Sequence, residues 1–156
     1  MARPGTSLSA FDVACRWLAR GPRSMAEVAT RLGKIGFSQR AVGDAVTRLV
    51  ELRFVDDEAL ARGRAEALGM RGYGNLRIER DLGRRGLGDG AITRALASLP
   101  AEPERARAWL VRFPRLGAKR AAWGALVRRG FAPETVEDIL GAVDDEESND
   151  GADDAV

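Results

Sequence analysis

Arginine is the residue type with the most evident chemistry in this chain of 156 residues. Of its 25 basic residues, 23 are Arg, and only Lys34 and Lys119 are Lys. A guanidinium group presents a planar fork of donors that fits a phosphate or a carboxylate in a bidentate manner. A GC-rich coding sequence would also produce many arginines, so the composition alone leaves both explanations open.

Basic side chains crowd three comparable segments, each predicted to be a short helix with its apolar residues on the opposite side. A charged face on a single helix is normally just solvated, but recurrence in three segments, in register, favours binding of nucleic-acid phosphates. Tyr73 lies at a corner between Gly72 and Gly74, where it either stacks on a base or packs beneath the corner. The candidate binding residues are Arg31 and Lys34 in the first segment, Arg71, Tyr73, Arg77, Arg80, Arg84 and Arg85 in the middle, and Lys119, Arg120, Arg128 and Arg129 in the third.

Other chemistries find little support. The chain has no histidine, which removes Ser-His and Cys-His nucleophile pairs and the usual zinc sites. Asp56-Asp57 is either a metal pair or, as we favour, a helix N-cap followed by a first-turn acid. No set of carboxylates is spaced to hold a metal, so we expect no enzyme, metal or cofactor, although a Mg²⁺-dependent nuclease stays a formal alternative. Cys15, the one cysteine, is expected to be a small buried side chain rather than a reactive thiol.

The formal net charge of +2 hides an asymmetry along the chain. Seven acidic and no basic residues follow Val143, so the 25 basic residues of 1–143 face only 16 of the 23 acidic ones, a net charge of +9. A basic body with an acidic tail suggests a polyanionic partner and a tail that competes with it. No apolar run approaches the roughly 18–20 residues of a membrane span, and no signal core is evident at the N-terminus, so we expect a cytoplasmic protein without membrane contact.

The arginines must be positioned by helices, because apolar residues recur at helical spacing throughout and no convincing strand pattern is found. The first helix is expected over about Ser9 to Arg20. The second begins at Ser24, which forms a capping box with Glu27, and the third begins after Ser38. Apolar positions expected to face inward are Phe11, Ala14, Cys15 and Leu18, then Met25, Val28 and Leu32, then Val42, Ala45, Val46, Leu49 and Leu52.

The stretch from Val55 to Leu87 combines a packed face and a cationic face. A helix follows Asp56-Asp57 with Leu60, Ala61, Arg64, Ala65 and Leu68 on one side. After the glycine corner, a second helix directs Ile78 and Leu82 one way and Arg77, Arg80 and Arg84 largely the other. Gly86 is expected to end this helix, with Leu87 folding back on it.

An apolar-glycine-apolar pattern occurs three times, at offsets of 50 and 44 residues. It comprises Leu32, Gly36 and Phe37, then Leu82, Gly86 and Leu87, then Leu126, Gly130 and Phe131. We therefore predict an all-α protein with three tandem three-helix repeats, at residues 1–54, 55–100 and 101–143, and a disordered acidic tail at 144–156. The first helix of the third repeat is expected at Pro103 to Arg112, with Phe113 among its apolar residues. Small units bury surface mainly against neighbours, which favours an elongated, curved array.

The central stretch resembles a known family. Its motif is Val55-Asp56-Asp57-(x2)-Leu60-Ala61, then Arg71-Gly72-Tyr73-Gly74-(x2)-Arg77-Ile78-(x2)-Asp81-Leu82-(x3)-Gly86-Leu87, and it is similar to the central motif of RecX, the bacterial regulator of the RecA recombinase. Arg23-Ser24-(x2)-Glu27-Val28-(x3)-Leu32 and Leu126-(x2)-Arg129-Gly130-Phe131 resemble the family's first and last units. The resemblance covers roughly Phe11 to Val143.

This resemblance implies tandem three-helix repeats, no catalysis and no cofactor. It also implies a monomer that binds along the groove of a RecA–DNA filament, with only weak affinity for single- and double-stranded DNA by itself. Such a protein inhibits strand exchange, ATP hydrolysis and co-protease action, and so modulates DNA repair and the SOS response. The alternatives are a general helical DNA- or RNA-binding protein without a recombinase partner, and the carboxylate-dependent nuclease.

Overall fold

The computed structural model describes residues 8–113 and 118–141, and within these residues it contains nine α-helices and no strand. The all-α prediction is therefore confirmed. In chain order the helices are α1 (Ala10–Leu18), α2 (Met25–Ile35), α3 (Gln39–Glu51), α4 (Asp57–Met70), α5 (Asn75–Arg84), α6 (Asp89–Ala97), α7 (Glu102–Arg112), α8 (Lys119–Arg128) and α9 (Pro133–Leu140).

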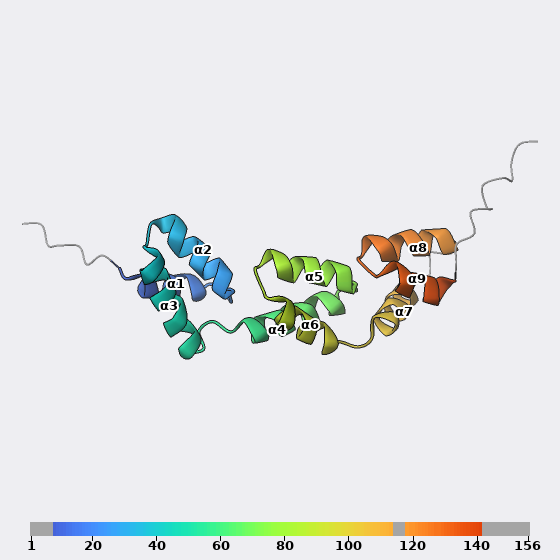
Figure 1. Cartoon of the computed structure of the whole chain (residues 1–156). Helices are drawn as coiled ribbons and strands as arrows, with labels where there is room; N and C mark the ends of the chain where they lie inside the picture. Colours follow the sequence, from blue (N-terminus) through green and yellow to red (C-terminus); the bar gives the residue numbers. More distant parts are fainter. Residues whose placement is uncertain (1–7, 114–117, 142–156) are drawn as a thin grey trace, which may run out of the picture.

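Each set of three consecutive helices encloses a core of its own, and we call these sets the first, second and third units. Their most deeply buried large side chains are Val28, Leu32 and Leu49 in the first, Ile78 and Leu82 in the second, and Leu126, Phe131 and Val136 in the third. The units follow one another in a gently bowed row (Figure 1). The expected elongated, curved array of three-helix repeats is confirmed, and α2, α5 and α8 lie along the upper edge of the row in this view.

The repeated glycine ends the second helix of every unit in the same way. Gly36, Gly86 and Gly130 have φ angles of 108°, 73° and 83°, the left-handed region that a side chain disfavours. The amide of the following apolar residue donates back to the helix, from Phe37 to Leu32, from Leu87 to Leu82 and from Phe131 to Leu126, at 3.2, 3.3 and 3.2 Å. This is a Schellman motif, which satisfies terminal carbonyls and turns the apolar residue into the core.

The predicted helix starts at Ser24 and Asp56 are also present. The Ser24 hydroxyl accepts from the amide of Glu27 at 3.0 Å, and the Glu27 carboxylate accepts from the amide of Ser24 at 2.8 Å. Asp56 caps α4 by accepting from the amide of Ala59 at 2.9 Å. Of the two interpretations of Asp56-Asp57, the helix cap is confirmed, and among the described residues no group of acidic or sulfur ligands is arranged to hold a metal.

Some apolar residues expected to face inward are exposed. Met25, Leu52 and Phe113 have exposed fractions of 41%, 48% and 49%. All three stand at helix ends, Met25 as the first residue of α2 and the other two just after α3 and α7, where the chain leaves the packed face. Val55, expected at the start of the second unit, is 2% exposed and packs into the core of the first.

The acidic tail predicted at 144–156 lies outside the described residues. Cys15 is half-buried against the first core, and burial raises the pKa of its thiol, in keeping with a structural role. Within the described residues, none of the helices combines the length and the apolar character that crossing a membrane would require.

Candidate nucleic-acid interface

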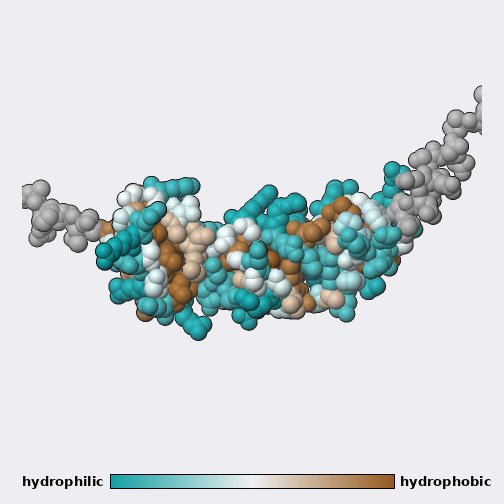
Figure 2. Space-filling model, in the orientation of Figure 1, coloured by the Kyte–Doolittle hydropathy of each residue, from teal (hydrophilic) through white to brown (hydrophobic). Residues whose placement is uncertain are grey.

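The second helix of each unit carries basic side chains on the surface of the row. On α5, Arg77, Arg80 and Arg84 are exposed, whereas Ile78 and Leu82 on the opposite side are fully buried. Hydrophilic residues accordingly dominate the upper edge of the middle unit in Figure 2. The division of α5 into a packed face and a cationic face is as predicted.

Only one basic position recurs strictly in all three units. Lys34, Arg84 and Arg128 each precede the Schellman glycine by two residues, and all three are exposed. The prediction that the other basic residues are in register is wrong, because the position of Arg31 is occupied by Asp81 in the second unit and by an alanine in the third. The repeated feature is thus a row of three cations, which we call the cation row.

The cation row is not neutralised by neighbouring acids. The ion pairs within the described part of the chain are Arg53–Asp56, Arg64–Asp81, Arg85–Glu27 and Arg94–Glu58, and none involves Lys34, Arg84 or Arg128. Asp81, one of the two acids of α5, accepts two hydrogen bonds of 2.8 Å from Arg64 of α4. The Arg64 guanidinium lowers the pKa of Asp81, which is therefore engaged on the side of α5 that faces α4.

Tyr73 packs beneath its corner rather than offering a free ring. Its ring is half-buried against the second core, and three guanidinium groups lie over it. The guanidinium carbons of Arg71, Arg77 and Arg129 are 5.5, 4.1 and 4.9 Å from the ring centroid. The packing alternative is thus the one that the structure supports, and the ring gathers three cations by cation–π contacts.

Arg85 and Arg129, two of the predicted binding residues, connect neighbouring units. Arg85 of the second unit donates to the carboxylate of Glu27 at 3.1 Å and to the carbonyl of Pro22 at 3.0 Å in the first. Arg129 of the third unit donates to the carbonyls of Gly72 and Arg71 in the second at 2.8 and 2.7 Å. Both arginines directly precede the Schellman glycine, and both are half-buried, so their guanidinium groups are already engaged within the chain.

Acidic residues at the start of α4 and α7 complete the same junctions. Asp57 accepts from the amide of Met25 at 2.9 Å, and Glu102 accepts from the amide of Asn75 at 2.6 Å. Each acid thereby satisfies the first amide of the second helix in the preceding unit. Glu102 is 8% exposed and also accepts from the hydroxyl of Thr135 at 2.8 Å.

The second junction has a further polar connection through Arg105, which is also 8% exposed. Its guanidinium donates to the carbonyl of Pro100 at 3.0 Å and to the carbonyl of Tyr73 at 2.6 Å. It also donates a hydrogen bond to the side-chain oxygen of Asn75. Burial lowers the pKa of Arg105, against the opposing effect of Glu102. The sequence patterns did not reveal Asp57, Glu102 or Arg105 as junction residues.

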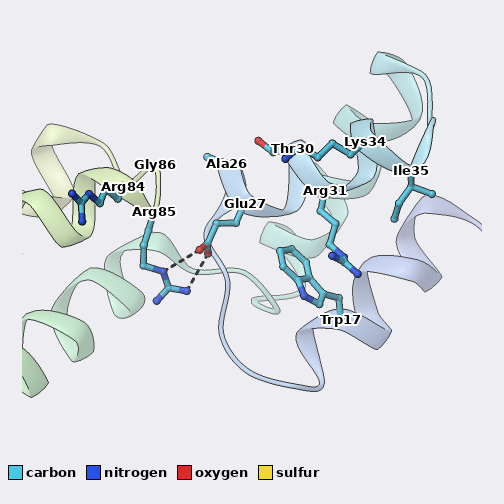
Figure 3. Close-up of a pocket in the computed structure, with 10 residues that line it drawn as sticks. All are labelled: Trp17, Ala26, Glu27, Thr30, Arg31, Lys34, Ile35, Arg84, Arg85 and Gly86. Carbon is cyan, nitrogen blue, oxygen red and sulfur yellow. Dashed lines mark hydrogen bonds and ion pairs between the residues drawn. The ribbon is translucent and has the colours of Figure 1, made fainter.

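A groove lies where the first and second units meet, and we call it the junction groove (Figure 3). It has a volume of about 570 Å³. The groove brings together four predicted residues from separate helices, Arg31 and Lys34 of α2 with Arg84 and Arg85 at the end of α5. The predicted residues Arg71, Tyr73, Arg77 and Arg80, and those of the third unit, do not line it.

The remaining predicted residues belong to the third unit. Lys119 and Arg120 are exposed at the start of α8, and Arg128 is exposed at its end. The structure thus distributes the predicted residues along the row: a groove at the first junction, an arginine cluster around Tyr73 at the second, and a cationic α8 at the far end.

The fold and its basic surface define a helical-repeat protein with a cationic face. A family model described as RecX, first three-helix domain, matches residues 10–49. The chain is 30% identical to the regulatory protein RecX of Chlorobaculum tepidum over 92% of this chain and 94% of that protein. It is 31% identical to the regulatory protein RecX of Halorhodospira halophila over 94% of this chain and 96% of that protein. This chain belongs to the RecX family, as the motif around Tyr73 indicated.

Solved structures agree in fold. The crystal structure of RecX from Lactobacillus salivarius superposes with a TM-score of 0.72 at 17% identity, covering 84% of this chain and 92% of that one. A second crystal structure of a regulatory protein RecX superposes with a TM-score of 0.69 at 20% identity, covering 83% of this chain and 69% of that one.

Proposed function

We propose that this protein binds the filament of the RecA recombinase on DNA and inhibits strand exchange, ATP hydrolysis and co-protease action. It would thereby modulate DNA repair and the SOS response. Acting as a cytoplasmic monomer, it would bind single- and double-stranded DNA only weakly without the recombinase. No catalytic step is part of this proposal.

The observation that carries the proposal is the cation row together with membership of a family of regulatory proteins. Lys34, Arg84 and Arg128 recur at equivalent positions without ion-pair partners among the described residues. A bowed row of cations suits a helical nucleoprotein filament, whose phosphates and protein surfaces also recur periodically. The printed names of its relatives, regulatory protein RecX, support a regulatory rather than a catalytic role.

The decisive experiment measures ATP hydrolysis and strand exchange by the cognate RecA with and without this protein. We expect inhibition at protein concentrations at which DNA binding by the protein alone is weak. Strong DNA binding without any effect on the recombinase would favour the general nucleic-acid-binding alternative. Loss of intact DNA on incubation with Mg²⁺ or Mn²⁺ would favour the nuclease.

A triple variant tests the cationic face of the middle unit. Arg77, Arg80 and Arg84 are exposed, and substitutions at such sites rarely change stability by more than about 0.5 kcal/mol each. Arg77 also lies over the Tyr73 ring at 4.1 Å, a contact worth about 0.5–1 kcal/mol at an exposed site. Replacing all three by Ala should therefore leave the protein folded with a modest loss of stability, abolish most inhibition and reduce the salt dependence of DNA binding.

Leu82→Ala serves as the control on the opposite face of the same helix. Leu82 is fully buried, so this variant should lose about 2–5 kcal/mol of stability through a core cavity. A triple arginine variant that folds and still inhibits RecA at wild-type concentrations would show that this face of α5 is only solvated surface.

A further inference from the structure

The junction groove combines cations with an apolar lining. Trp17, Ala26 and Ile35 supply apolar surface, and Ile35 is 52% exposed although it is a large aliphatic side chain. Arg31, Lys34 and Arg84 supply positive charge. A partner that matches this lining carries negative charge and an apolar body together.

The groove has a net positive charge. Its one acidic side chain, Glu27, is paired with Arg85, so these two charges offset each other. No acid among the described residues forms an ion pair with Arg31, Lys34 or Arg84. Three uncompensated cations therefore border an opening of about 570 Å³.

Trp17 holds one of these cations in place. The guanidinium carbon of Arg31 lies 4.8 Å from the centroid of the Trp17 ring, and the two side chains lie together on the first unit's wall in Figure 3. A second arginine, Arg23, lies over the same ring at 4.7 Å. Two cations thus lie over the Trp17 ring, and the groove offers further apolar surface at Ile35 and Ala26.

Ile35 occupies a position that joins neighbouring units elsewhere in the chain. In the second and third units the equivalent residues are Arg85 and Arg129, which bond to the preceding unit. In the first unit this position is an isoleucine, whose aliphatic side chain lies at the groove.

We propose that the junction groove binds a nucleotide of single-stranded DNA, with its phosphate at Lys34 and Arg84 and its base against Ile35. This inference rests on the proposed function, because it takes DNA as the polyanion. The volume lies within the range of about 300–1,000 Å³ typical of small-ligand sites. A single strand is required because the base faces of a duplex are stacked on one another, whereas those of a single strand are free to turn onto such an apolar wall.

The test uses the full chain and a fluorescently labelled oligothymidylate, followed by anisotropy. The variant Lys34→Gln/Arg84→Gln should weaken binding at least tenfold. It should reduce the slope of log K against log salt by about 0.7, the contribution of one phosphate contact on a single strand. The matched control Arg40→Gln/Arg62→Gln removes two exposed cations that do not line the groove. It should change affinity less than threefold. Equal losses in the two variants would overturn the proposal.

A second arm tests the base. Wild-type protein should bind oligothymidylate several-fold more tightly than an abasic oligonucleotide of the same length, and Ile35→Ser should remove that preference. Equal affinity of the wild type for both strands would overturn the base contact. Displacement of the strand by micromolar thymidine monophosphate would assign the groove to free nucleotides and overturn the strand proposal.

The groove assignment and the proposed function can be refuted independently of each other. If the Lys34/Arg84 variant binds single strands normally while the wild type inhibits RecA, the groove is not the nucleotide site and the proposed function stands. If groove-dependent binding is found but RecA is unaffected, the proposed function is overturned and the groove assignment stands.

Discussion

Gly74 offers the sharpest test of how the second and third units are joined. Its φ of −81° and ψ of 171° are extended backbone that any residue adopts, so the position does not require glycine for conformational reasons. A Cβ atom at this position would, however, lie 2.2 Å from the backbone nitrogen of Phe131 and 2.3 Å from the carbonyl of Gly130. Backbone cannot yield as a flexible side chain can, so Gly74→Ala must push the units apart.

The cost of this substitution follows from what must move. Overpacking a close contact costs about 1–3 kcal/mol. Separation of the units would also break two backbone hydrogen bonds. The amide of Gly74 donates to the carbonyl of Arg129 at 2.9 Å, and the amide of Leu76 donates to the carbonyl of Gly130 at 3.0 Å. Each is worth about 0.5–1.5 kcal/mol. We therefore expect Gly74→Ala to lower the free energy of unfolding by about 2–6 kcal/mol if both bonds are lost.

Urea denaturation followed by tryptophan fluorescence measures this effect, because Trp109 and Trp123 both pack in the third core. Gly63→Ala is the matched control. Gly63 lies within α4, and a Cβ atom at this position would meet nothing within 4 Å. Since alanine is favoured over glycine inside a helix, the control should gain about 0.5–1 kcal/mol. Unchanged unfolding of Gly74→Ala would refute the close approach of the two units.

Two further predictions concern charge. Burial alone would raise the pKa of Glu27, but hydrogen bonds from Arg85 and from the amide of Ser24 outweigh it, so the pKa is lowered from 4.5. The ionised Glu27 carboxylate therefore stabilises the fold above pH 4.5, and this contribution is lost as the pH falls further. Glu27→Gln should flatten the decline in the free energy of unfolding below that pH, as measured by urea titrations. An unaltered pH profile would contradict the pairing of Glu27 with Arg85. Truncation after Val143 removes seven acidic residues and should raise DNA affinity most at low salt, as measured by anisotropy; equal affinities of the two forms at low ionic strength would count against a competing tail.

The helices and their cores were predictable because the signals for them are local. Apolar spacing within one helix predicted the burial of Ile78 and Leu82, and the glycine after each second helix predicted its end. Residues whose burial was predicted wrongly, such as Leu52, stand at helix ends. There the apolar spacing continues by one residue after the packed face of the helix has ended. Side-chain burial at a terminus depends on where the chain goes next, which spacing does not encode.

The junctions could not be derived from spacing, because their partners are far apart in the chain. Arg85 and Glu27 are 58 residues apart, and Met25 and Asp57 are 32 apart. A signal was nevertheless present: the residue before the repeated glycine is arginine in the second and third units and Ile35 in the first. An arginine that recurs at this position in two successive units suggests a repeated contact between units, rather than with an outside polyanion.

This distinction divides the four arginines at the ends of α5 and α8 into two classes by position. Those that directly precede the glycine, Arg85 and Arg129, join units. Those one residue earlier, Arg84 and Arg128, remain exposed, as does Lys34 at the equivalent position of the first unit. The junction contacts fix each second helix against its neighbour and therefore fix the spacing of the cation row. Several weak contacts held at fixed spacing bind a matching partner far more tightly than any one of them. Selectivity for a periodic filament over isolated DNA would then depend on the buried junction residues as much as on the exposed arginines.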